Sequence, residues 1–326
     1  MDDSTGTDHA ARRADARTHA AAQRRAAATS AADRLKAIGL MCLAVTLFSA
    51  LDTSAKYLVT QTHMPVAEVV WVRFAGQFLI MLSLLSAMPL AALLRTRKLK
   101  LELLRSLLMV LTTAGNFLAL RHLRLDQTVS VAFLAPLLVA LLAGPFLGEW
   151  VGWRRLVAIC TGFIGVLIIV HPGIGGLHPA FAFAFGSVMA YAVFILMTRF
   201  LAAHDAPLAM LFYSILIGTV ALAPIAIWQW VWPESLWQWL LLLGLGVFGG
   251  SGHYLMIHAY RLAPAPDVVP FLYMQLLSMV AFGFAVFGDI PDVWTLVGAS
   301  VIVGSGIYLL SRDRKLREEV AAVDPI

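Results

Sequence analysis

The sequence predicts an all-α polytopic membrane protein with ten transmembrane helices, arranged as two inverted five-helix repeats. Hydrophobic residues make up 60% of the 326 residues and charged residues only 13%, which leaves too little polar surface for a soluble domain of this length. The net charge of +5 comes from short basic clusters beside apolar stretches. This pattern indicates membrane topology rather than a surface that binds nucleic acid.

Ten apolar stretches follow one another from Ala37 onward. Most approach the ~20 residues that a helix needs to cross a ~30 Å hydrocarbon core, and the fifth is at the lower limit. Together they leave no room for a catalytic domain outside the membrane. The stretches run over 37–59, 66–88, 101–120, 128–147, 153–170, 180–200, 208–230, 236–260, 266–288 and 294–310.

The basic residues orient these stretches. If the N-terminus is cytoplasmic, the inside connections hold twenty of the 24 lysine and arginine residues and the outside connections hold two. Lys56 and Arg73, the remaining two, fall within stretches. Anionic inner-leaflet lipid and the membrane potential both retain cations on the inside. We therefore predict two cytoplasmic tails, a disordered one over 1–35 and a second over 312–326, in a bacterial inner membrane, with a eukaryotic organelle membrane as the alternative.

The two halves of the chain share an ordered series of residues, spaced 137 to 141 positions apart. Chance matches between helices rich in Gly and Leu are the alternative explanation. The repeats, over 36–171 and 172–311, each contain five spans, so the second copy crosses the membrane in the opposite orientation. Inverted repeats place a central site between two bundles that rock against each other. The matched pairs are Asn116 and His253, Pro136 and Gln275, Gly148 and Gly288, Trp153 and Trp294, and Gly165 and Gly306.

Several motifs resemble the drug/metabolite transporter superfamily, and within it the bacterial permeases with two EamA-type domains. They are Gly148-Glu149 at the end of the fourth span, Gly162…Gly165 in the fifth, and the runs 52–57 and 71–74 in the first two. The last two are similar to a subgroup that includes S-adenosylmethionine uptake carriers. The chain departs from the family pattern at Asp289, where Glu is more common, and the shorter side chain puts any inherited role there in doubt.

Ionisable side chains within spans are costly in a bilayer and mark candidate sites. Asp52 and Lys56 are four residues apart on one helical face and can pair. Counted from the outer ends near Thr60 and Pro65, Asp52 and Arg73 both lie roughly 12 Å deep at 1.5 Å per residue. Two interpretations stay open. One is a structural ion pair, with Lys56 reaching to the interface; the other is a carboxylate that binds substrate or a proton and is released as Arg73 shifts.

Other polar residues complete the candidate set. The amide of Asn116, in the third span, can bond a ligand or a neighbouring helix. His253, deep in the eighth span, lies beside several glycines, and both a cavity-facing role and a structural role stay open for it. Glu68 lies near the outer interface and is expected to be hydrated. Asp52 is then the one acidic residue clearly within a span, and the one candidate for proton coupling.

Spans four and nine carry prolines. Pro136 and Pro270 remove backbone hydrogen bonds, so we predict a bend in each span. The family resemblance implies that these two spans line the transport pathway. It thereby adds Tyr273 and Gln275 as ligand contacts, although polar residues in spans are more often structural.

These features favour secondary-active transport of a small organic metabolite by alternating access. The substrate classes considered are amino acids, nucleoside-like compounds and vitamins. No Walker A sequence occurs, so the energy would come from a proton, ion, exchange or substrate gradient. A membrane-embedded lipid-modifying enzyme and a channel are the alternatives. The dispersed histidines and the lack of a polar pore-lining helix count against both.

We expect a small-molecule substrate, a co-transported proton and membrane lipids as partners. We expect no enzymatic activity, cofactor, metal or nucleic acid. Small residues four apart, at Gly246 and Gly250 and at Ala158 and Gly162, allow close helix packing within a monomer or in a homodimer. Import and export are both compatible with this architecture.

Overall fold

The computed structural model contains helices and no strands in the residues it describes, which confirms the all-α prediction. Its backbone is described except at 1–3, 85–93, 95, 148–151, 171–177, 202–203, 264–267 and 324–326. Side chains are also not described at 4–31, 146–147, 154–155, 170, 207, 269–270, 309–310 and 312–323. The expected tails, 1–35 and 312–326, fall almost entirely outside the described side chains, and the disorder of the first stays a prediction.

The helices account for the ten predicted stretches. Seven are long and apolar enough to cross a membrane, and shorter apolar helices at Leu156–Ile169, Phe271–Phe287 and Val293–Tyr308 supply the other three. Spans one to five are α1 (Ser4–Thr60), α2 (Val66–Leu84), α4 (Leu99–Leu120), α5 (Leu125–Ala132) with α6 (Ala135–Leu147), and α7 (Trp153–Val170). Spans six to ten are α8 (Ala180–Leu201), α9 (Pro207–Trp228), α10 (Leu236–Leu262), η1 (Val269–Tyr273) with α12 (Met274–Phe282) and η2 (Gly283–Phe287), and α13 (Val293–Val323).

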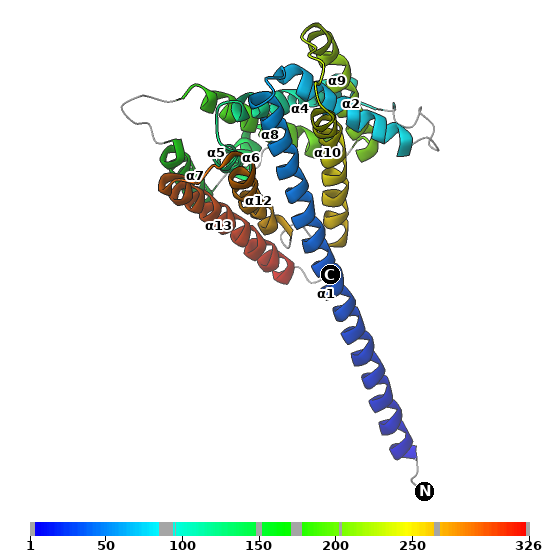
Figure 1. Ribbon diagram of the computed structural model, residues 1–326. Coiled ribbons are helices and arrows are strands. Elements are labelled where there is room, and N and C mark those ends of the chain that lie inside the picture. The colour runs from blue at the N-terminus through cyan, green and yellow to red at the C-terminus, as the bar shows by residue number, and fades with distance from the viewer. Residues whose placement is uncertain are drawn as a thin grey trace.

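Helix packing pairs the two halves of the chain symmetrically. Span one packs on span eight, and span three packs on span six; Figure 1 shows the first pair, α1 and α10, side by side. Span one also contacts span nine, as span six contacts span four. Spans two and seven pack on each other, and so do spans five and ten. Each of these contacts therefore has a counterpart in which the halves exchange places, as an inverted repeat requires.

Glycines allow two of these helix pairs to approach closely. Gly76 of α2 lies against Gly246 of α10, where a Cβ on Gly246 would come within 2.9 Å of the Gly76 backbone. Gly165 of α7 and Gly298 of α13 face each other in the same way. Backbone contacts of this kind are typical of membrane helices, which lack a hydrophobic driving force for association.

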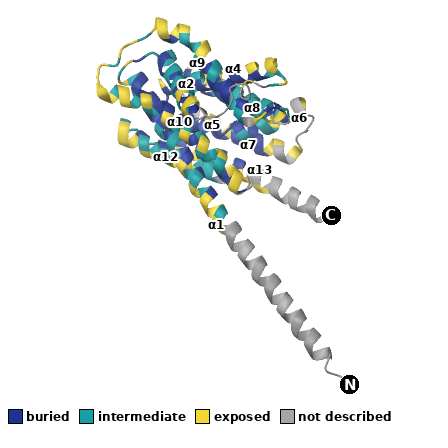
Figure 2. Ribbon diagram, turned by 90° about the vertical axis from the view of Figure 1, so that its right-hand side faces the viewer, coloured by how far each residue is buried: buried dark blue, intermediate teal, exposed yellow. Residues whose placement is uncertain are grey.

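The outside of the bundle is apolar. Trp228 is 83% exposed and Leu236 is 76% exposed, and many other large apolar side chains are exposed along the helices. Buried residues lie between the helices and exposed ones on the periphery (Figure 2). A surface of this kind suits contact with lipid rather than water.

Spans four and nine are irregular at matched positions. Span four is interrupted at Phe133 and Leu134, and Pro136 is the second residue of the helix that resumes. Span nine begins as a 3-10 helix containing Pro270, continues as α12 and ends as a π-helix. The new helices start at Ala135 and Met274, which differ by the same 139 positions as Pro136 and Gln275. Both irregularities thus occupy equivalent places in the repeat.

Candidate functional site

Four of the candidate residues come together in the middle of the bundle. Asp52 of α1 accepts a hydrogen bond of 3.1 Å from the Asn116 amide of α4. Arg73 of α2 is close enough to interact electrostatically with both Asp52 and His253 of α10. We call Asp52, Arg73, Asn116, His253 and the adjoining Thr113 the central cluster. It joins spans one, two, three and eight, and so draws on both repeats.

The two charged residues of the central cluster are buried, and the arginine is only partly hydrogen-bonded. Asp52 is 9% exposed and Arg73 is 7% exposed. Arg73 donates from Nη1 to the Thr113 hydroxyl, while its Nε has no hydrogen-bond partner. Leaving a buried donor unpaired is unfavourable, so the free Nε–H offers a bond to an acceptor that enters the site.

A further residue of this region was not among the sequence candidates. Gln77 lies one turn after Arg73 on α2, is 6% exposed, and has no partner for its Nε2. Its amide lies over Gly249 of α10, one turn before His253. The His253 ring packs edge-on against Phe48 at 4.9 Å. The spacing of four residues places Gln77 on the same helix face as Arg73, and this was the sequence signal that could have identified it. A single glutamine in a span has no distinctive pattern around it.

Tyr273 and Gln275 lie on span nine, and no described hydrogen bond or ring contact joins them to the central cluster. Tyr273 packs edge-on against Phe133 at 4.8 Å, which brings the irregular parts of spans four and nine into contact. The Gln275 carbonyl accepts a bond of 3.5 Å from Ser49 of α1. Span nine therefore packs against α1, the helix that carries Asp52.

Lys56 pairs with Asp289 rather than with Asp52. The Lys56 ammonium lies 3.0 Å from the Asp289 carboxylate and 4.5 Å from the centre of the Phe287 ring. Gly288 adopts a left-handed conformation, with φ of 70°, and turns the chain at the end of the π-helix just before Asp289. The aspartate that departs from the family pattern thus binds a cation of the opposite repeat.

A second ionic contact links the repeats at the same end of the bundle. Arg124, at the start of α5, lies 2.5 Å from Asp126 and 3.7 Å from Asp292, which precedes α13. Together with Lys56 and Asp289, these residues form what we call the outer ion pairs. They connect spans one and four to the loop between spans nine and ten.

Two further carboxylates are buried near the starts of their helices, and one of them contradicts the expectation that Glu68 is hydrated. Glu68, expected to be hydrated, is fully buried and accepts a bond of 3.0 Å from the Val231 amide. Glu102 is also fully buried in the first turn of α4 and lies 2.5 Å from Arg105. Depth along one helix does not reveal the loops and helices that cover its ends, so the sequence did not indicate that these side chains are buried.

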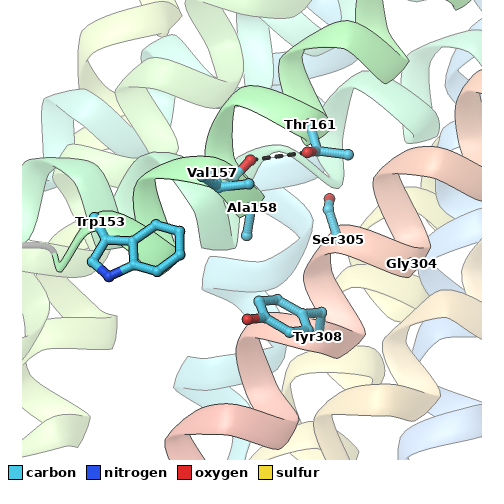
Figure 3. Close-up of a pocket in the computed structure, with 7 residues that line it drawn as sticks. All are labelled: Trp153, Val157, Ala158, Thr161, Gly304, Ser305 and Tyr308. Carbon is cyan, nitrogen blue, oxygen red and sulfur yellow. Dashed lines mark hydrogen bonds between the residues drawn. The ribbon is translucent and has the colours of Figure 1, made fainter.

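Two cavities are lined by residues outside the central cluster. One, of about 340 Å³, is a groove between α7 and α13, with Trp153 and Tyr308 toward one end and Thr161 and Ser305 toward the other (Figure 3). The Thr161 hydroxyl donates to the Val157 carbonyl at 2.9 Å, so it is already partnered. The other cavity, of about 510 Å³, lies where α1, α2, α4 and α9 reach the predicted outer side.

The architecture is that of a helical membrane transporter, with two symmetric five-span units and a buried polar site between them. A model of the EamA-like transporter family matches residues 35–171 and again residues 178–312. The chain therefore belongs to the EamA-like transporter family, within the drug/metabolite transporter superfamily.

Named relatives agree with this assignment. The chain is 30% identical over 269 residues to a riboflavin transporter of Vibrio cholerae, which covers 82% of this chain and 90% of the relative. It is 26% identical over 281 residues to an S-adenosylmethionine uptake transporter of Rickettsia conorii, covering 86% and 94%. A pseudopaline exporter of Pseudomonas aeruginosa is 28% identical over 292 residues, covering 85% and 96%. The chain is thus a small-metabolite transporter.

A solved structure, titled only "Crystal structure of protein", shares the fold. It superposes with a TM-score of 0.59 over 86% of this chain and 98% of that chain, at 18% sequence identity. At that identity the likeness supports the arrangement of helices alone.

Proposed function

We propose that this protein is a secondary-active carrier of a small organic metabolite and that the central cluster binds the substrate. The observation that carries the proposal is the incomplete bonding of a buried arginine: Arg73, which interacts electrostatically with Asp52 and His253, has an Nε–H without a partner. Polar groups inside a membrane are retained mainly where they serve a function. The position between the repeats is where inverted-repeat carriers bind their substrates.

The substrate class follows from the relatives and from these groups. Riboflavin and S-adenosylmethionine, named for the relatives, are both heterocyclic metabolites with several hydrogen-bonding atoms. The central cluster offers donors, an acceptor and an aromatic ring, which suit such a molecule. Of the classes expected from the sequence, we favour vitamins and nucleoside-like compounds over amino acids.

Alternating access is the mechanism we propose. The outer ion pairs hold the two repeats together at the predicted outer end, and their release would open that end. The matched irregularities of spans four and nine meet at Phe133 and Tyr273, where a change of helix geometry would be least costly.

Energy would come from a gradient, with Asp52 as the carboxylate that binds a co-transported proton. Because the neutral form of a buried carboxyl group needs less solvation, proton binding and substrate release can be coupled there. We place the protein in a bacterial inner membrane with both termini cytoplasmic, surrounded by lipid, as a monomer or homodimer. No enzymatic activity and no nucleic-acid partner form part of this proposal.

Flux measurements test it. Right-side-out and inverted vesicles would be loaded with riboflavin, S-adenosylmethionine, nucleosides and amino acids, and exchange of each labelled compound would be followed. We expect saturable flux of at least one compound, lost in Asp52→Asn and retained in Glu68→Gln, which alters a buried carboxylate outside the cluster. Equal flux in wild type and Asp52→Asn, with both proteins inserted, would reject Asp52 as part of the site.

A further inference from the structure

The 510 Å³ cavity at the predicted outer end has the properties of a small-molecule site. Its wall is mostly apolar and includes Val70 and Leu118, while three polar side chains, His63, Arg121 and Gln229, also line it. Its volume and this mixture of a largely apolar wall with a few polar groups are typical of ligand pockets. Nothing in the central cluster lines this cavity, so the two sites are separate in this conformation.

The cavity carries a positive charge. Arg121 lines it and makes no ion pair with any residue that the structure describes, and no carboxylate is among the lining residues. Glu68, on the first turn of α2, turns its carboxylate to the Val231 amide instead. A neutral or anionic ligand with acceptor atoms is therefore favoured over a cation.

The inner end of the cavity adjoins the central cluster. Val70 lines the cavity, and Arg73 follows one turn deeper on the same face of α2. On α4, Ala114 lines the cavity, and Thr113 is its immediate neighbour. The hydrogen bond from Arg73 to Thr113 thus joins α2 and α4 next to residues that line the cavity, and Arg73 also has an Nε–H without a partner.

We infer that this outer cavity is the first binding station of the transported molecule, and that the molecule is a neutral or anionic heterocycle rich in acceptor atoms, with one apolar flank. The inference rests on the proposed function and narrows it. Arg121 holds the acceptor atoms, the apolar wall holds the flank, and Arg73 receives the same acceptors one turn deeper. Riboflavin meets this description, whereas the sulfonium cation S-adenosylmethionine does not.

Equilibrium binding to the purified full-length protein tests the cavity, with riboflavin and S-adenosylmethionine as probes. Arg121→Gln should weaken riboflavin binding by about two- to fivefold, as for the loss of an exposed ion pair or charge-assisted contact, and more at low salt. Ala114→Phe, which fills the cavity, should weaken it by roughly tenfold or more. The matched control, Leu111→Phe, adds the same ring on the exposed side of α4 and should bind as wild type does.

Each result decides the matter. Riboflavin binding that both cavity variants weaken, with no competition from S-adenosylmethionine, supports the inference. Tight binding of S-adenosylmethionine, no binding of riboflavin to folded wild type, or unchanged binding in Ala114→Phe overturns it. An Asp52-dependent flux that Ala114→Phe leaves intact would overturn the outer station while sparing the proposed function.

Lipid is the other source of an amphipathic molecule with an acceptor-rich end. The same titration in nanodiscs of phosphatidylglycerol and of phosphatidylcholine separates the two. Equal riboflavin affinity in both supports the substrate station. Competition by phosphatidylglycerol that disappears in Arg121→Gln would show a lipid site and overturn the inference.

Discussion

Two buried arginines, Arg105 and Arg73, differ in how fully they are hydrogen-bonded. Arg105 of α4 is 3% exposed and Arg73 of α2 is 7% exposed. Arg105 donates to Glu102, Thr198, Ser214 and the Met210 carbonyl, and uses all three of its nitrogens. Arg73 donates to Thr113 from one nitrogen, and its Nε remains without a partner.

The difference separates architecture from function. The partners of Arg105 come from α4, α8 and α9, so the residue fastens three helices together. A fully bonded guanidinium has little to offer a ligand. The vacant donor of Arg73 fits a group that is completed by a visiting molecule, because persistent unpaired donors are rare in protein interiors.

Replacing Arg105 should give the largest effect. Arg105→Met leaves the Glu102 carboxylate buried without its cation, and removing one member of a buried pair costs about 3–5 kcal/mol. We expect a large fall in the thermal unfolding temperature of the detergent-purified protein, with flux per folded molecule unchanged. Glu102→Gln combined with Arg105→Met should recover most of the stability. Equal stability of Arg105→Met and wild type would contradict this role.

Replacing Arg73 should reduce flux strongly and stability only slightly, the opposite of replacing Arg105. Arg73→Lys keeps the charge but loses the planar fork, so substrate hydrogen bonds that depend on Nε are lost. A hydrogen bond to a charged group contributes about 1.5–3 kcal/mol, so flux at low substrate concentration should fall by about ten- to a hundredfold. The unfolding temperature should change less than in Arg105→Met. If Arg73→Lys instead unfolded at a much lower temperature than wild type and transported normally, Arg73 would have the structural role that we assign to Arg105.

The outer ion pairs allow a smaller test. Asp289→Asn removes the carboxylate that Lys56 binds, and we expect a shift of about 1 kcal/mol, or roughly fivefold, toward the outward-open state. The readout is the rate at which an impermeant thiol reagent labels Ser49→Cys in protein whose native cysteines, Cys42 and Cys160, have been replaced. Labelling should speed up in Asp289→Asn and slow again when the charges are exchanged in Lys56→Asp/Asp289→Lys. An unchanged rate would show that the pair does not hold the bundle closed.

Asp205 provides the smallest effect and a pH dependence. Burial disfavours its charge, but bonds from Thr96 at 2.5 Å and the Arg97 amide at 2.8 Å, with the nearby cations, outweigh it and lower the pKa of Asp205 below 3.8. A lowered folded pKa contributes stability that is complete above the unfolded pKa and is lost as pH falls through the folded pKa. The free energy of unfolding of wild type should exceed that of Asp205→Asn by about 0.5–1 kcal/mol at neutral pH. This difference should vanish as pH falls below about 3.8. A gap that widens in acid would contradict this sign.

Much of the fold was predictable because a bilayer imposes strong rules on the sequence. Span length, the exclusion of charge and the inside excess of cations fix the number of helices and the class. Pro136 and Pro270 predicted a bend in spans four and nine, and both spans are irregular near these prolines. The contacts between buried side chains were harder to predict, because the sequence indicates the depth of a residue in the membrane but not the residue that it contacts.

The central cluster shows this limit. Equal depth brought Asp52 and Arg73 together correctly, but the sequence did not indicate that Asn116 would bond Asp52. Lys56 and Asp289 are 233 residues apart, and their contact depends on the turn at Gly288. Arg105 lies about one turn into α4, and the sequence did not indicate that α8 and α9 would supply its hydrogen-bond partners.

The most direct test of the central cluster is substrate-induced stabilisation of the purified protein. A ligand that binds the folded state alone, at about 100 times its dissociation constant, stabilises it by about 2.7 kcal/mol. The compound with the highest flux should raise the unfolding temperature of wild type and Glu68→Gln, and leave that of Asp52→Asn nearly unchanged. Equal stabilisation of Asp52→Asn at the same concentrations would place the binding site elsewhere in the protein.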